Sequence, residues 1–152
     1  MAKAVFEALD AFTLQEHLHD GANGLVYDPA AKGGTTNIDV DFHGKRLREY
    51  VSLAGTHNNC AGGVTPWNTW LSCEESEGRA GEKFTKEHGY VFEVTADGKA
   101  DPRPIKCLGR YSHEAVAIGH DRKSIYLSED ADEPNGLFYR WTAPAGVRVG
   151  PG

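Results

Sequence analysis

The chain has 152 residues, of which 39% are hydrophobic and 25% charged, and its formal net charge at pH 7 is −6. This composition is ordinary for a globular protein and excludes a disordered or collagen-like chain. The acidic balance argues against nucleic acid as a partner, because phosphate backbones select clustered Lys and Arg. No run of about 18 apolar residues occurs, so no membrane span is predicted.

Residues 1–26 are predicted to form an N-terminal segment that is helical over residues 5–19. The apolar stripe of this helix comprises Val5, Phe6, Leu9, Phe12 and Leu14. Beyond it, short apolar runs bounded by glycine and aspartate predict strands joined by tight turns. The predicted strands are 35–42, 47–53, 69–73, 90–95, 115–118, 124–128 and 137–141. Residues 27–152 are therefore predicted to form an all-β domain.

Two parts of this domain resemble each other at offsets between 47 and 56 residues. The similar segments are 53–55 with 107–109, 59–61 with 113–115, 70–75 with 126–130, and 89–94 with 136–141. Propeller blades repeat at about 40 to 50 residues, so the repeat predicts consecutive β-propeller blades. About two to three blades fit this length, whereas closed propellers have about four to eight. The chain is expected to be part of a propeller whose remaining blades are missing.

The densest polar segment, residues 55–75, places Cys60 in a loop ahead of a strand that ends in two carboxylates. The glycine pair Gly62-Gly63 lets backbone come close, which suits a thiolate held against a metal ion. Thiolate favours iron or zinc, whereas carboxylates favour calcium, magnesium or manganese. The available acids are Glu74, Glu75, Glu114, Glu129 and Asp130. Solvation at the surface is the alternative reading for the Glu-Glu pair.

The cysteines and histidines offer few other sites. Cys60, Cys73 and Cys107 form no Cys-x-x-Cys pair, so neither a disulfide scaffold nor a thiolate zinc finger is expected. His113 is a candidate ligand or an orienting donor beside Glu114. The remaining histidines are predicted to be solvated: His17, His19, His43, His88 and His120.

The sequence contains no motif for nucleotide binding or for covalent catalysis. No Gly-x-Gly-x-x-Gly, no phosphate loop and no Gly-x-Ser-x-Gly elbow occurs. The glycine-rich stretch 33–37 runs into a strand instead, which makes Asn37 a candidate donor to an anion.

Four stretches, 28–37, 59–75, 109–117 and 126–130, resemble the PhoX-type alkaline phosphatase family of bacteria. The segment Asn-Cys-Ala-Gly-Gly-Val-Thr-Pro-Trp at 59–67 is the most specific, and the resemblance covers residues 27–142. It implies a β-propeller whose channel holds iron and calcium and which hydrolyses phosphate monoesters. It also implies a periplasmic or extracellular location.

The resemblance implies roles for particular residues. Cys60 would be a thiolate ligand to iron, and Glu74, Glu75, Glu114 and Glu129 would bind metal. Asn37 would hydrogen-bond the phosphate, which places Asn37 and Cys60 in the catalytic site. The family's later Arg-Pro-Glu stretch is missing, since Arg103-Pro104 is followed by Ile105, and Asn68 stands where a glycine is usual. The chain is thus expected to carry part of a metal site.

The expected activity is phosphoric monoester hydrolysis with an iron and calcium cluster. One alternative is a non-catalytic calcium-binding or assembly module built from propeller blades. Another is a sugar-lactone or ester hydrolase, because the architecture alone does not choose a reaction.

Overall fold

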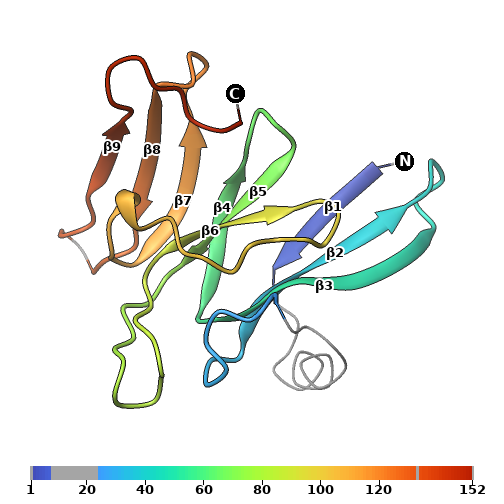
Figure 1. Ribbon diagram of the computed structural model, residues 1–152, viewed down its shortest axis with the longest axis horizontal. Helices are drawn as coiled ribbons and strands as arrows, with labels where there is room; N and C mark the ends of the chain where they lie inside the picture. Colours follow the sequence, from blue (N-terminus) through green and yellow to red (C-terminus); the bar gives the residue numbers. More distant parts are fainter. Residues whose placement is uncertain (1, 8–23, 133, 152) are drawn as a thin grey trace.

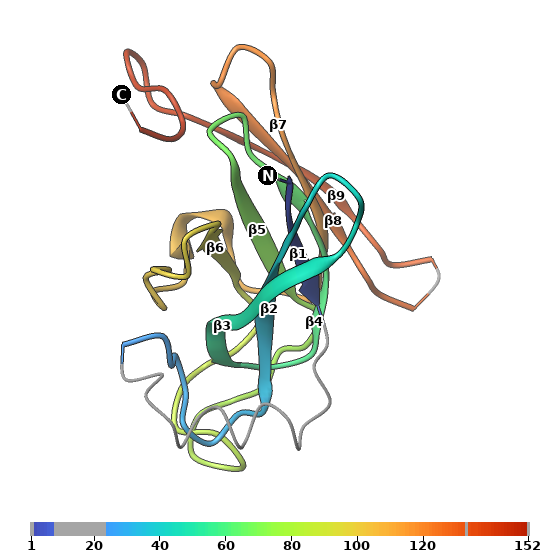
Figure 2. The same ribbon diagram turned by 90° about the vertical axis from the view of Figure 1, so that its right-hand side faces the viewer.

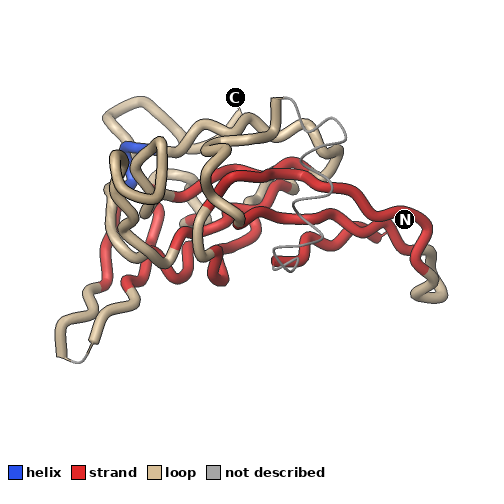
Figure 3. The backbone as a smooth tube through the Cα atoms, turned by 90° about the horizontal axis from the view of Figure 1, so that it is seen from below, coloured by secondary structure: helices blue, strands red, loops and turns tan. Residues whose placement is uncertain are grey.

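The computed structural model describes residues 2–7, 24–132 and 134–151 (Figure 1). Apart from one short 3-10 turn, the regular secondary structure of these residues is all strand, joined by loops (Figure 3). The elements are β1 Ala2–Glu7, β2 Gly33–Val40, β3 Arg46–Thr56, β4 Asn59–Val64, β5 Thr69–Glu74, β6 Val91–Thr95, η1 Lys106–Leu108, β7 His113–Ile118, β8 Ser124–Glu129 and β9 Phe138–Thr142. The predicted all-β class is confirmed. None of the helical segments in the described ranges has the length and hydropathy needed to cross a bilayer.

The strands form two open sheets. The first has the antiparallel order β1-β2-β3, and the second has the order β6-β5-β4-β7-β8-β9. The second sheet consists of two antiparallel three-stranded meanders, β4-β5-β6 and β7-β8-β9, joined through the parallel pair β4 and β7. Figure 1 shows β4 and β7 running in the same direction. These meanders are the two units of the predicted repeat, whereas the number of propeller blades stays a prediction.

The seven predicted strands correspond to β2, β3 and β5 to β9, and two further strands depart from expectation. Residues 2–7 form β1, although a helix is predicted from residue 5; Val5 and Phe6 pair with Asn37 and Thr36 of β2. Antiparallel pairing with β2 gives the backbone of this edge strand its hydrogen-bond partners on one side. Residues 8–19 of the predicted helix lie outside the described residues. The second addition is β4, which lies where a loop is predicted.

Two apolar clusters form the core. The larger lies within the six-stranded sheet and its covering loops and comprises Leu71, Cys73, Val91, Leu108, Tyr111, Val116, Ile125 and Leu127. The smaller joins the two sheets and comprises Tyr27, Leu53, Tyr90, Phe92 and Val94. Figure 2, turned by 90°, shows the three-stranded sheet in front of β4 and β5. Burial of these side chains is the main favourable contribution to folding.

Asn68 turns the β4–β5 connection with a left-handed backbone, φ +65°. Its backbone N–H donates to the carbonyl of Thr65, which closes the turn. Asparagine tolerates this region better than most residues other than glycine. Replacing Asn68 with alanine is expected to lower the free energy of unfolding by about 1 kcal/mol, and replacing it with glycine to change it by less than about 0.5 kcal/mol. Urea denaturation of both variants checks this, and equal losses would contradict it.

Candidate metal site where β4 and β7 begin

The candidate site lies at one end of the six-stranded sheet, where β4 and β7 begin and β5 and β8 end. Asn59 pairs with Glu74 at this end of the first meander, and His113 pairs with Glu129 at the corresponding end of the second. The backbone bonds there are equivalent as well, since the N–H of Glu75 donates to Asn58 and that of Asp130 to Ser112. The predicted ligand positions therefore share one end of the sheet.

Two glycines allow β4 to approach its two neighbours closely: a Cβ at Gly62 would meet the backbone carbonyl of Leu71 on β5, and one at Gly63 would meet that of Val116 on β7. Gly62 pairs with Ala115 across the parallel contact, and its φ of +96° is in the region that glycine adopts readily. A Cβ at Gly63 would meet the carbonyl oxygen of Val116 far inside the 3.0 Å that real Cβ atoms keep. The glycine pair thus lets β4 lie close to β5 on one side and to β7 on the other, while its predicted role beside a metal stays a prediction.

Cys60 is half-buried in β4, and two carboxylates act on its thiol: Glu75, which follows β5, and Glu114, which is exposed on β7. Burial raises the pKa of its thiol most, followed by the hydrogen bond that the thiol donates to Glu75; the charges of Glu75 and Glu114 raise this pKa further. Ion pairs among the described residues include neither carboxylate. This group, Cys60, Glu75 and Glu114, is called the thiol–carboxylate group below. Its negative charge has no basic partner within the described chain.

Glu74, the neighbour of Glu75, is fully buried and accepts four hydrogen bonds from protein groups. Oε1 accepts from the N–H of His57 and from Nδ1 of His88, at 2.8 and 2.6 Å. Oε2 accepts from the N–H groups of Gly89 and Tyr90, at 2.8 and 3.1 Å. Charge-assisted bonds of this kind hold a buried carboxylate in place. The structure therefore commits Glu74 to loop contacts and does not place it in the thiol–carboxylate group.

The other predicted site residues are spread more widely. Glu129 accepts hydrogen bonds from the Tyr139 hydroxyl and the N–H of Leu137, and Asp130 is exposed. Asn37 is buried in β2 of the other sheet, where its amide Nδ2 donates to the carbonyl of Thr95 at 2.9 Å. Its Oδ1 has no hydrogen-bond partner. The donor predicted for a phosphate instead joins β2 to β6.

His113 and His88 are both fully buried, so the solvated setting predicted for His88 is wrong. His88 lies between two carboxylates, with Nδ1 facing Glu74 and Nε2 facing Asp28 at 3.3 Å. Burial lowers its pKa, but the bonds and charges of Glu74 and Asp28 outweigh burial and raise it. His113 has no carboxylate bonded to its ring, and burial lowers its pKa to about 4.

Sequence reasoning missed Asp28 and the role of His88. Asp28 precedes Pro29 and accepts a local bond from the N–H of Ala30, a pattern that indicates only a turn. Its contacts with Thr85, Lys86 and His88 span nearly 60 residues of sequence. The burial of Asp28, at 0% exposure, therefore had no local signal.

The residues present fit a cation in the kind of donors they offer, one sulfur and two carboxylates. Within residues 2–7, 24–132 and 134–151, however, no group of three or more His, Cys, Asp or Glu side chains could hold a metal ion as placed. The three side chains of the thiol–carboxylate group are therefore not placed to hold a metal ion together. The three cysteines form no disulfide, and Cys73 is buried while Cys107 is exposed.

The fold and this end of the sheet define an all-β protein with a thiol and two carboxylates near the start of β4 and β7. The sequence model of the alkaline phosphatase PhoX family matches residues 29–151. Because this match spans most of the chain, the protein belongs to the PhoX alkaline phosphatase family. No curated protein and no solved structure gives a significant match to the chain.

Proposed function

We propose that this chain takes part in the hydrolysis of phosphate monoesters with iron and calcium held by Cys60, Glu75 and Glu114. Membership of the PhoX alkaline phosphatase family supports the reaction class. The observation that carries the proposal is the gathering of a half-buried thiol and two carboxylates without basic partners at the start of β4 and β7. A cation would balance the charge of this group.

The donor types suit two kinds of ion. The sulfur of Cys60 is a soft ligand appropriate to iron, and the oxygens of Glu75 and Glu114 are hard ligands appropriate to calcium. When bound, such ions polarise the phosphoryl oxygens of a substrate. The thiol hydrogen that Cys60 donates to Glu75 would leave on binding, because only the thiolate ligates a metal. Metal affinity is therefore expected to increase with pH.

The proposed ligand set is narrower than the one predicted from sequence. Glu74 and Glu129 already accept hydrogen bonds from protein donors, so the proposal gives them no ligand role. A contact between Asn37 and phosphate would require its buried amide to leave Thr95. The three residues of the thiol–carboxylate group are the ones that we propose to bind metal.

Replacing Cys60 with alanine is expected to reduce the metal-dependent hydrolysis of p-nitrophenyl phosphate by about tenfold or more, because a ligand of the proposed ion is lost. The measurement compares initial rates of the full chain with iron and calcium supplied. Cys107→Ala is the matched control, since Cys107 is exposed and lies outside the group; its rate should equal that of wild type.

Equal rates in Cys60→Ala and wild type would remove the enzymatic role of this group. Calcium binding without hydrolysis, unchanged by Cys60→Ala, would favour the alternative of a calcium-binding or assembly module. Substrate profiling with lactones and carboxylic esters separates the remaining hydrolase alternative, because the architecture alone does not fix the reaction.

A further inference from the structure

A network of three fully buried ionisable side chains, Asp28, His88 and Glu74, includes the residue that precedes Glu75 of the thiol–carboxylate group. His88 bridges Glu74 and Asp28, with its ring nitrogens 2.6 Å from Oε1 of Glu74 and 3.3 Å from Oδ2 of Asp28. All three side chains have 0% exposure. Buried charges are costly unless they are paired and hydrogen-bonded, and here His88 pairs with both carboxylates.

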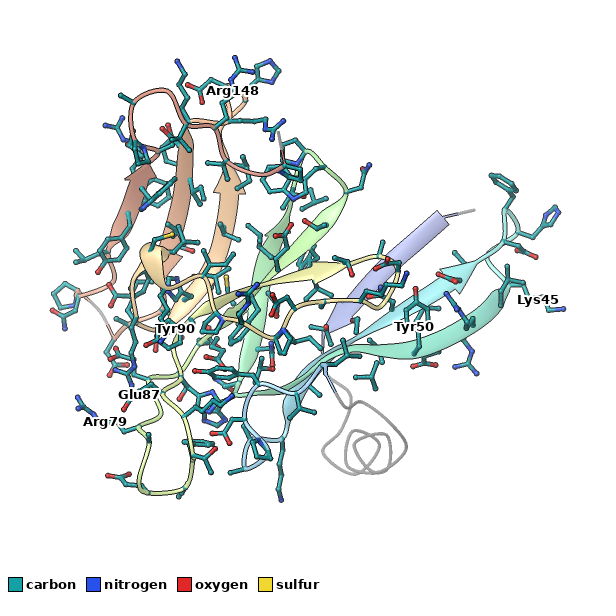
Figure 4. All side chains as sticks on the ribbon, viewed as in Figure 1. Lys45, Tyr50, Arg79, Glu87, Tyr90 and Arg148 are labelled. Atoms are coloured by element: carbon teal, nitrogen blue, oxygen red, sulfur yellow. The ribbon has the colours of Figure 1, made fainter. Side chains whose placement is uncertain are left out.

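The network of Asp28, His88 and Glu74 holds the loop that follows Glu75, from residue 76 to residue 87. In Figure 4 this loop extends away from the sheets and carries the labelled residues Arg79 and Glu87. Asp28 accepts bonds from the N–H groups of Thr85 and Lys86, each 2.8 Å, and from the Thr85 hydroxyl at 2.6 Å. Asp28, at one end of the network, thus holds residues 85 and 86 of this loop.

Glu74, at the other end of the network, holds the residues that precede Cys60. Glu74 accepts the N–H of His57, and Asn58 bonds twice with Glu75: the N–H of Glu75 donates to the Asn58 carbonyl at 2.9 Å, and Nδ2 of Asn58 donates to the Glu75 carbonyl at 3.1 Å. The backbone leading to Cys60 and the backbone carrying Glu75 are therefore fastened to each other and to Glu74. The distance between these two backbone segments in turn sets the distance between the Cys60 thiol and the Glu75 carboxylate.

We propose that Asp28, His88 and Glu74 are positioning residues that hold the Cys60 thiol and the Glu75 carboxylate at the distance needed to bind a shared cation. This inference rests on the proposed function, because it assigns the network a role at that metal site. Residues that orient ligands through hydrogen bonds affect metal affinity although they do not touch the ion. Cobalt(II) alone is a suitable probe, since a thiolate bound to it gives a charge-transfer absorption that reports the Cys60 ligand.

The experiment titrates the full chain with cobalt(II) and follows this absorption. His88→Gln, which cannot bond both carboxylates, is expected to weaken cobalt binding by about tenfold and to change the charge-transfer band. Tyr27→Phe is the matched control: it removes the hydroxyl bond to the Glu87 carbonyl, at 2.7 Å, which joins the same two loops without touching Glu74. It should lower Tm while cobalt affinity stays within about twofold of wild type.

Asn58→Gly gives a second test that does not depend on a buried substitution. Asn58 is exposed and has φ +49°, a conformation that glycine keeps, so the variant removes mainly the side-chain bond to Glu75. It is expected to weaken cobalt binding by about threefold. Wild-type affinity and band shape in both His88→Gln and Asn58→Gly, or an equal loss in Tyr27→Phe, would overturn the positioning role. Absence of the band in wild type would instead overturn the proposed metal site itself.

Discussion

Replacing Gly63 with alanine is expected to lower the free energy of unfolding by about 3 kcal/mol or more. The added Cβ would overlap the backbone carbonyl of Val116, which cannot turn aside as a flexible side chain could. Relief would require β4 and β7 to move apart, although their parallel contact is what joins the two meanders. Urea denaturation of the full chain measures the loss.

Gly146→Ala is the control for this prediction. Gly146 has φ +81° and open space around its would-be Cβ, so alanine there costs only the left-handed conformation, about 1 kcal/mol. Gly63 lies outside the left-handed region, so its whole cost comes from the Val116 contact. Equal losses in the two variants would show that β4 and β7 do not depend on this close approach.

The same contact determines the distance between the proposed ligands. Cys60 lies two residues before Gly62 on β4, and Glu114 lies one residue before Ala115 on β7, so the pair Gly62 and Ala115 sets their separation. Gly63→Ala should therefore also weaken cobalt(II) binding at the thiol–carboxylate group. Glycine at this position would then serve the proposed metal site through strand packing alone.

The strands could be predicted because their signals are local: alternating apolar residues bounded by turn residues, repeated in both meanders. The strand β4 could not, since the segment Asn59–Val64 is polar and glycine-rich and takes its extended form from pairing with β5 and β7. Its neighbours override its weak propensity. The same override makes residues 2–7 a strand beside β2.

The site was partly predictable for a similar reason. Cys60 and Glu75 lie at the ends of adjacent strands, a relation that the sequence pattern contains. Whether Glu74 or Glu75 faces the thiol depends on the register between β4 and β5, which shifts between Cys60 and Gly63. Neighbouring residues of a strand point to opposite faces, so this shift decides the role of each carboxylate. The contact between Asp28 and His88 depends on the tertiary fold alone.

Acidification from pH 6.5 to pH 4 is expected to remove about 3 kcal/mol of stability through His113. Burial lowers the pKa of this fully buried ring to about 4, although the Gly109 carbonyl and the charge of Glu129 partly offset burial. Above pH 6.5 the ring is neutral in both the folded and unfolded states. Between pH 6.5 and 4 the unfolded chain binds a proton that the folded chain does not, so each pH unit costs about 1.4 kcal/mol.

His113→Phe isolates this contribution, because phenylalanine can stack on Tyr111, whose ring centroid lies 3.7 Å from that of His113, and it has no titrating group. The measured quantity is the difference in unfolding free energy between wild type and variant across pH 4 to 8, with a chelator present. This difference cancels the opposite effect of His88, whose raised pKa favours folding at low pH. It should change by about 3 kcal/mol below pH 6.5 and stay constant above it. The control is His120→Gln: His120 is exposed, so the difference in unfolding free energy between this variant and wild type should not change with pH. If the difference for His113→Phe did not change with pH either, the folded protein would accommodate a charged His113.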